Sequence, residues 1–207
     1  VGATGNVDEG VLIYGATNTV IGGTAAADRN VISGNRLRGV FVDDATDGSA
    51  PVSDGTRIIG NYIGLDATGA TALPYSGGAT PSYQQIGVAI WGGPDNIIGT
   101  ASTGNTISGN AWHGVYVWGA ESTGNTIQGN TIGLDAAGTT PVPNGYENAT
   151  RSAVNISSAP DNLIGGDAPG EGNVIAGNAS LGVAILGTGA ANNAIVGNSM
   201  YGNTGLG

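Results

Sequence analysis

The stretch GNTISGNAWHGVYVWGAESTGNTIQGNTIGLD, residues 104 to 135, contains three short phrases that recur along a chain of 207 residues. The phrases are Gly-Val-x-Val/Ile, Asn-x-Ile-x-Gly, and a second Asn-x-Ile that ends in Gly-Asn or Leu-Asp. Each alternates apolar and polar residues, which is the period of a half-buried strand, and none is long enough for a helix. The repetition therefore predicts a solenoid of short strands.

Sorting the phrases gives three strand types, each present once per coil in a constant order. The first type covers residues 10–13, 39–42, 87–90, 114–117, 153–156 and 182–185. The second covers residues 19–23, 56–60, 96–100, 125–129, 162–166 and 193–197. The third covers residues 30–35, 61–66, 105–110, 130–135, 173–178 and 198–203. Because parallel crossovers are nearly always right-handed, we predict an all-β, right-handed parallel β-helix of about six coils, without a helical cap.

Stacking the coils aligns Val and Ile residues, which suit the inner wall of a pleated sheet. In the first strand type the inward residues are Val11/Ile13, Val40/Val42, Val88/Ile90, Val115/Val117, Val154/Ile156 and Val183/Ile185. In the second they are Ile21, Ile58, Ile98, Ile127, Ile164 and Ile195. In the third they are Ile32, Ile63, Ile107, Ile132, Ile175 and Met200. A slip of one residue would turn this set to solvent, so the register is strongly specified.

An asparagine begins the third strand type in every coil. These residues are Asn30, Asn61, Asn105, Asn130, Asn173 and Asn198. Stacked at the strand spacing of about 4.8 Å, their amides are placed to hydrogen-bond from coil to coil, as in asparagine ladders. We therefore assign them a structural role.

Three long loops interrupt the repeats, at residues 43–55, 67–85 and 136–152. Two of them follow a Gly-Leu-Asp ending, at Asp66 and Asp135, so a unit of two coils recurs. Loops that recur on one edge of a solenoid are where a binding surface is expected. We interpret residues 1–207 as a single β-helix domain, a fragment or subunit of a longer solenoid whose ends neighbouring coils or subunits cover.

The composition excludes several classes of protein. The formal net charge is −10, and the only basic residues besides one histidine are five arginines. Nucleic-acid binding needs clustered basic residues, and no apolar run approaches a membrane-spanning length, so neither partner is expected. With no cysteine there is no disulfide pattern to interpret. The low charge and the abundance of Thr, Asn and Gly favour an extracellular protein.

The phrases Asn-x-Ile-Gly-Gly, Asn-x-Ile-Ser-Gly-Asn and Asn-x-Ile-Gly-Leu-Asp resemble repeats of large bacterial surface and secreted proteins. Those repeats belong to right-handed parallel β-helix proteins of the pectin-lyase-like fold group. The resemblance covers nearly the whole chain and implies an extracellular or cell-surface location in a bacterium. It implies no single activity, because that scaffold carries lyases, hydrolases, epimerases, phage tailspikes and adhesins.

The first candidate site is the most acidic loop. It contains Asp43, Asp44, Asp47 and Asp54 within twelve residues. Calcium prefers several oxygen ligands, so these carboxylates are candidate calcium ligands, although the spacing is not that of an EF-hand. The alternative is a solvated acidic loop. No other cofactor is expected.

The second candidate is catalytic, with Asp43, Asp44 and His113 as the residues. Paired carboxylates are what glycoside hydrolysis requires, and polygalacturonase-like members of the fold group use an Asp-Asp pair with a Gly-His-Gly segment and an Arg-Ile-Lys segment. Here Trp112-His113-Gly114 and Arg57-Ile58-Ile59 correspond only in part, since the lysine is missing. The spacing also places His113 two coils from the aspartates, and the arginines form no obvious cluster. The alternative for His113 is an ordinary turn residue.

The third candidate is an aromatic surface. Trp91 and Trp118 follow the first strand type in adjacent coils, so we expect them to stack about 4.8 Å apart. Phe41 and Tyr116 are expected on the outward face of the same sheet. Aromatic faces there would hold sugar rings or a protein partner; the alternative is that they shield the sheet edge.

These observations favour a structural or adhesive module of a secreted or cell-surface protein. It would be a rigid spacer that presents loops, packed into a filament or sheath. The alternative is a carbohydrate-active module that binds or cleaves an extracellular polysaccharide. The missing family residues favour a protein that is not an enzyme.

Overall fold

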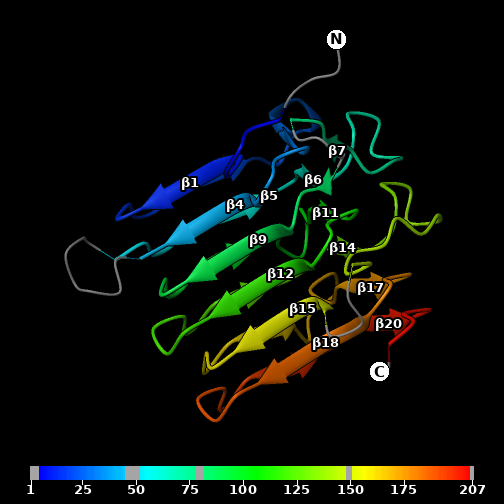
Figure 1. The fold of residues 1–207 in the computed structure, drawn as a ribbon. Coiled ribbons are helices and arrows are strands. Elements are labelled where there is room, and N and C mark those ends of the chain that lie inside the picture. Colours follow the sequence, from blue (N-terminus) through cyan, green and yellow to red (C-terminus); the bar gives the residue numbers. More distant parts are fainter. Residues whose placement is uncertain (1–4, 45–51, 78–81, 148–150, 206–207) are drawn as a thin grey trace.

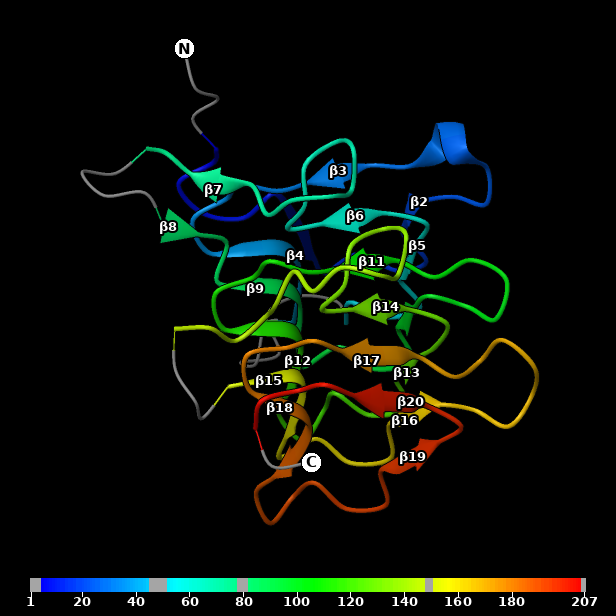
Figure 2. The ribbon, with the colours of Figure 1, turned by 90° about the vertical axis from the view of Figure 1, so that its right-hand side faces the viewer.

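A computed structural model describes residues 5–44, 52–77, 82–147 and 151–205 and shows a right-handed parallel β-helix (Figure 1). Each coil adds one strand to each of three six-stranded parallel sheets (Figure 2). The first sheet contains β1 (Val11–Tyr14), β4 (Arg38–Asp43), β9 (Ile86–Trp91), β12 (His113–Trp118), β15 (Ser152–Ser157) and β18 (Leu181–Leu186). The second contains β2 (Val20–Gly22), β5 (Arg57–Ile59), β10 (Ile97–Ile98), β13 (Thr126–Ile127), β16 (Leu163–Gly165) and β19 (Ala194–Val196). The third contains β3 (Val31–Ile32), β6 (Tyr62–Ile63), β11 (Thr106–Ile107), β14 (Thr131–Ile132), β17 (Val174–Ala176) and β20 (Ser199–Tyr201).

Three further elements lie outside the three sheets. A short antiparallel pair, β7 (Pro74–Tyr75) and β8 (Ser82–Tyr83), belongs to the loop at residues 67–85. The helical content of the described residues is a single 3₁₀ turn, η1 (Ala26–Asp28), so the predicted lack of a helical cap is confirmed for them. Nothing in that part of the chain is both helical and apolar over the length that a membrane crossing requires.

The predicted register is confirmed throughout the three sheets. Val115 pairs with Val88 on one side and with Val154 on the other, and all three are fully buried. Ile98 pairs with Ile58 and Ile127 in the same way in the second sheet. The last coil differs, because Ile195 and Met200 lie in register but are 44% and 49% exposed. Their predicted burial is therefore not found, because no further coil covers them within the described residues.

The predicted asparagine ladder is present. In each step the side-chain amide of one residue donates to Oδ1 of the next, over 2.8–3.0 Å. The backbone N–H of the same residue donates to the same oxygen, for example from Asn105 to Asn130 at 3.0 Å. A buried amide that would otherwise be unsatisfied is thereby paired at nearly every coil.

Two more ladders, which the sequence analysis did not recognise, run parallel to the first. One connects Asn96, Asn125, Asn162 and Asn193. The other connects Asn6, Asn35, Gln84, Asn110, Asn144, Asn178 and Asn203. Gln84 and Asn144 lie within the two long loops that follow Asp66 and Asp135, so each loop returns to the corner of the coil at a ladder position.

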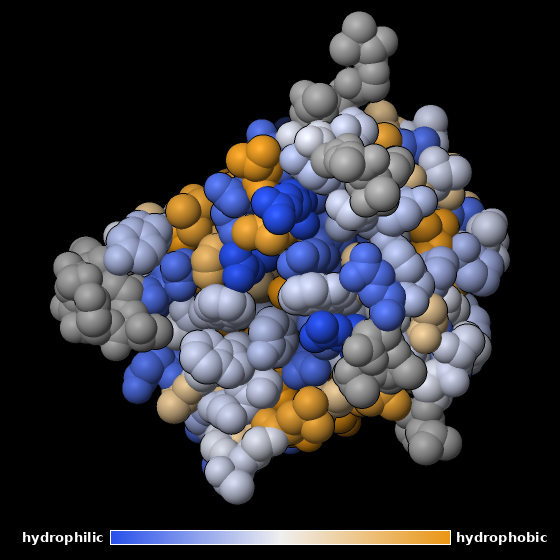
Figure 3. Space-filling model, viewed as in Figure 1, coloured by the Kyte–Doolittle hydropathy of each residue, from blue (hydrophilic) through white to orange (hydrophobic). Residues whose placement is uncertain are grey.

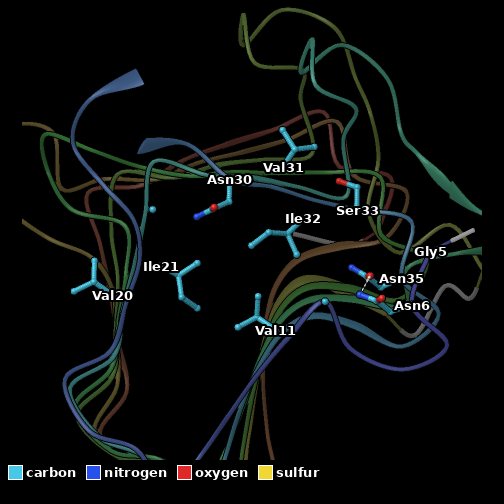
Figure 4. A pocket seen from close by; sticks show the side chains of 12 residues that line it. Gly5, Asn6, Val11, Val20, Ile21, Asn30, Val31, Ile32, Ser33 and Asn35 are labelled. Atoms are coloured by element: carbon cyan, nitrogen blue, oxygen red, sulfur yellow. Dashed lines mark hydrogen bonds between the residues drawn. The ribbon is translucent and has the colours of Figure 1, made fainter. Parts of the chain in front are cut away.

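The glycines beside the strands are needed for close approach between coils. Gly99 has a φ of 75°, which favours glycine, and a Cβ there would clash with the carbonyl oxygen of Gln128 in the next coil. A cavity of 610 Å³ at the outer end of the first coil is lined in part by Val11, Ile21 and Ile32. Figure 4 shows these three side chains projecting inward from the three sheets.

Candidate functional site

The outer face of the first sheet does not repeat as its inner face does. Strand register there creates columns of unlike side chains, which are Arg38–Ile86–His113, Phe41–Ala89–Tyr116–Asn155 and Asp43–Trp91–Trp118–Ser157. Figure 3 shows that hydrophilic and intermediate residues predominate in the middle of this face. The same pairing that aligns identical residues inside therefore assembles different chemical groups outside.

These columns border a depression of 490 Å³ that we call the aromatic groove. Its lining residues are Arg38, Gln85, Ile86, Trp91, Trp112, His113, Tyr116, Arg151, Asn155, Ser157 and Leu186. They come from five successive strands of the first sheet, β4 to β18, and from the segments that precede them. Adjacent strands lie about 4.8 Å apart, so the groove follows the solenoid axis over roughly 19 Å.

The rings in and beside the groove pack edge to face. Trp91 contacts Phe41, Tyr116 and Trp118 with centroid separations of 5.1, 6.4 and 5.6 Å. Aromatic pairs prefer such geometry, and each pair contributes roughly 0.5–1.5 kcal/mol beyond the burial of its rings. The aromatic cluster is therefore a rigid wall that does not depend on a bound ligand.

Two arginines lie at the groove in different electrostatic settings. Arg38 forms an ion pair with Glu9 at 2.6 Å, and its guanidinium lies over the rings of Phe41 and Trp91, 4.2 and 4.5 Å from their centroids. Arg151 lies 4.3 Å over the ring of Trp112. Within the described residues Arg151 has no ion-pair partner. The groove is therefore neutralised at the Arg38 end and positive at the Arg151 end.

His113 lies on the floor of the groove, between the two arginines in strand order. Only 4% of its surface is exposed, and its ring stacks on Tyr116 at 5.1 Å. Its Nδ1 lies 3.2 Å from the backbone N and 3.1 Å from the backbone O of Ser152. The pKa of His113 is lowered from 6.5 to about 4, mainly by burial and to a smaller extent by the neighbouring Arg151 charge, while the hydrogen bond to the Ser152 backbone opposes the shift. The imidazole is therefore neutral at pH 7.

Three residues of the groove contain buried polar atoms without a hydrogen-bond partner. They are Trp91 through Nε1, Arg151 through Nε and Asn155 through Oδ1. Only two other side-chain atoms of the described residues share this state, Asp44 Oδ1 and Thr56 Oγ1. An unsatisfied buried group costs about 1–3 kcal/mol, so unsatisfied atoms in one groove mark a place where stability is not optimised.

The structure places the predicted aromatic residues together but corrects their geometry. Trp91 and Trp118 are paired in adjacent coils, as predicted, yet their rings are inclined by 61° and are not stacked face to face. The reason is that Phe41 and Tyr116 also pack edge-on against Trp91. Phe41 is only 6% exposed, whereas Trp118 is 41% exposed and lies outside the groove lining.

The catalytic candidates lie apart. Asp43 is the last residue of β4, whereas His113 is the first residue of β12, two coils away. That difference corresponds to roughly 17 Å along the strands and 10 Å across them. His113 is a strand residue and not the turn residue that we considered as the alternative. Burial raises the pKa of Asp43, although Arg38 opposes that effect.

The calcium candidates are only partly described. Asp47 lies outside the described residues, and Asp43, Asp44 and Asp54 do not form a group of three within the described part of the chain. The calcium site stays a prediction.

The sequence did not indicate that the arginines and Trp112 belong to one site. We found no obvious arginine cluster, but Arg38 and Arg151 line the same groove. The signal for Arg38 was its position one residue before a first-type phrase, the same position that His113 occupies. Arg151 ends a long loop, so no strand pattern indicated where its side chain would lie.

No protein-family model matches the chain, and no curated protein matches its sequence. Two solved structures that it resembles are mutants of the periplasmic alginate epimerase AlgG, with TM-scores of 0.51 and 0.50 and sequence identities of 14% and 13%. In both cases the likeness covers 96% of this chain and 48% of that chain, so this chain spans about half the length of those structures. The likeness establishes the class of fold, a right-handed parallel β-helix.

Proposed function

We propose that this β-helix binds a polysaccharide in the aromatic groove, as part of a bacterial protein that acts outside the cytoplasm. The observation that carries the proposal is the set of unpartnered polar atoms on Trp91, Arg151 and Asn155. Binding sites tolerate such groups because a ligand satisfies them. Since these atoms are enclosed by their neighbours, binding would include small rotations of the side chains.

The chemistry of the walls suits sugars. Sugar rings have apolar C–H faces, which aromatic rings can cover, and hydroxyl groups, which amides and guanidinium groups can bind. Trp91 and Tyr116 supply the first kind of surface, and Asn155 and Arg151 supply the second. Sites for small molecules are typically apolar with a few placed polar groups. The likeness to a polysaccharide-modifying epimerase supports the same class of ligand.

The solenoid supplies the rigidity that such a groove needs. Four of the five strands below the groove, β4, β9, β12 and β15, are paired on both sides. A structural or adhesive role in a secreted or cell-surface protein is compatible with this groove, because adhesion would then operate through the bound glycan.

A second candidate is chemical modification of the bound polysaccharide. The observation that favours it is a neutral histidine, His113, beside Arg151, which has no ion-pair partner among the described residues. Removal of a proton next to a carboxylate needs a base and a cation that neutralises the carboxylate. A base whose pKa is near 4 is weak at neutral pH, so binding is the primary proposal.

A glycan-binding assay with three variants tests the proposal. Trp91→Phe removes the unpartnered Nε1 but keeps a ring, and we expect it to weaken binding at least fivefold. Trp118→Phe makes the same change one coil away, outside the groove, and we expect less than a twofold effect. His113→Gln separates the candidates, because it should remove product formation, if there is any, while binding persists. Absence of binding to every polysaccharide of a broad panel would overturn the proposal.

A further inference from the structure

We infer that the polysaccharide carries acidic groups, and that Arg151 binds one of them at the β15 end of the aromatic groove. The inference rests on the proposed function and specifies its ligand as an anionic sugar residue, a carboxylate or a sulfate. It also specifies an orientation, with an acidic group at Arg151 and sugar rings over Trp91 and Tyr116.

The first argument is the distribution of charge. The chain has a formal net charge of −10 and only five arginines, yet two of the five line this groove. None of the residues that line it is an aspartate or a glutamate. The Arg151 end of the groove is thus a local cationic surface on an acidic solenoid. The negative charge of the rest of the solenoid would repel a polyanion, whereas the positive charge in the groove would attract it.

The second argument is the difference between the two arginines. Arg38 is already paired with Glu9 and lies near Asp43, so an anion would meet repulsion at that end. Arg151 is partly buried, rests on Trp112, and lacks an acidic partner among the described residues. The nearby carboxylate of Glu147 accepts a hydrogen bond of 2.9 Å from Trp112 Nε1 and makes no ion pair with Arg151. The positive charge without an ion-pair partner therefore lies at the Arg151 end of the groove only.

The third argument is the chemistry of the guanidinium group. A partly buried cation without a counterion has lost hydration without recovering it. A carboxylate or sulfate oxygen would restore that loss through charge-assisted hydrogen bonds, which are about twice as strong as neutral ones. The ring of Trp112 fixes the plane of the guanidinium, and a fixed plane favours bidentate recognition of an acidic group. A neutral sugar would leave the charge of Arg151 uncompensated.

Calorimetric titration with matched glycans tests the inference. The probes are an oligouronate, the same oligosaccharide with its carboxyl groups reduced to alcohols, and a sulfated neutral oligosaccharide. We expect the wild-type protein to bind the oligouronate at least tenfold more tightly than the reduced form. Arg151→Gln should remove that preference, whereas Arg57→Gln, a change at an exposed arginine of the second sheet, should leave it intact.

The outcomes are distinguishable. Equal affinity of the wild-type protein for the oligouronate and its reduced form would overturn this inference but leave polysaccharide binding in place. No binding of any probe or other glycan would overturn the proposed function itself. Preference for the sulfated probe would identify sulfate, and preference for the oligouronate would identify carboxylate, as the acidic group. Retention of the acidic preference in a folded Arg151→Gln variant would show that Arg151 is not the binding residue.

Discussion

The two faces of the first sheet share one backbone and one register but differ in how they use the repeat. On the inner face Val40, Val88, Val115 and Val154 repeat at one position and are all fully buried. On the outer face Phe41, Ala89, Tyr116 and Asn155 occupy the neighbouring position. Identical residues form the scaffold on the inner face, and the aromatic groove lies on the outer face, where the residues differ from coil to coil. The difference can be tested by making equal changes on each side.

We expect the largest loss of stability from a substitution on the inner face of the coils. Ile127→Ala removes a fully buried side chain in the middle of the second sheet, with Ile98 and Ile164 paired to it. Leu or Ile to Ala changes in tight cores cost about 2–5 kcal/mol. Urea unfolding followed by circular dichroism would measure the loss. Thr126→Ala, one residue earlier and facing outward, is the control, and an equal loss there would contradict the assignment of the inner face.

The second prediction concerns the pH dependence of stability, which depends on the burial of His113. The pKa of His113 is lower in the folded chain than in the unfolded chain, so folding excludes a proton. Its contribution to stability is present above pH 6.5 and is lost as the pH falls toward the folded value of about 4. The lowering of the pKa from 6.5 to about 4 corresponds to about 3 kcal/mol in the free energy of unfolding.

His113→Gln should remove this pH dependence, because glutamine does not titrate. The free energy of unfolding of both proteins would be measured between pH 4.5 and 7, and their difference isolates His113 from the carboxylates. Parallel profiles would show that the imidazole is accessible to protons in the folded protein, which would place it outside the groove floor.

Much of this architecture could be predicted from the sequence because it depends on identical residues at a fixed period. The Asn105 ladder and the Ile98 and Ile127 register follow directly from that period. The aromatic groove could not be predicted in the same way. Arg38 and Arg151 are more than 100 positions apart in the sequence and come from a strand start and a loop end. Their proximity to one groove depends on loop paths and side-chain rotamers, which leave no periodic signal.

The burial of Phe41 and the inclination of the Trp91 and Trp118 rings illustrate the same limit. Register predicted which residues would be adjacent, and that prediction is confirmed. Ring orientation depends on how several outward side chains fill one surface together. Pairwise spacing along the chain does not contain that information.

The third effect is expected to have opposite signs in the aromatic groove and in an asparagine ladder. Asn155→Leu replaces an unpartnered outer amide with an apolar side chain of similar size, and we expect a gain of about 1 kcal/mol in stability. The same variant should bind polysaccharide more weakly. Asn105→Leu makes the identical change within a ladder, where the side chain is hydrogen-bonded to Asn61 and Asn130, and it should destabilise the fold. Thermal unfolding compares the two, and equal signs would contradict the distinction between site and scaffold.

The smallest effect is expected in the loops that follow the repeated Leu-Asp phrases. Asp66 Oδ1 accepts hydrogen bonds from the hydroxyl of Thr68 at 2.7 Å and from the backbone N of Ala70 at 3.2 Å, and Asp135 accepts them from the backbone N of Thr139 and Thr140. The hydrogen bond from Thr68 contributes most to holding the pKa of Asp66 below its usual value.

These turns are near the surface, so Asp66→Ala should cost less than about 1 kcal/mol. Because the folded pKa is lowered, the contribution of Asp66 is present above the unfolded pKa of about 3.9 and is lost as the pH falls through the lower folded value. Hydrogen exchange of the amides of Thr68 and Ala70 would detect the loosened turn, with the Asp135 turn in the same sample as the internal control. A loss as large as that of Ile127→Ala would mean that the loops, and not only the coils, hold the solenoid together.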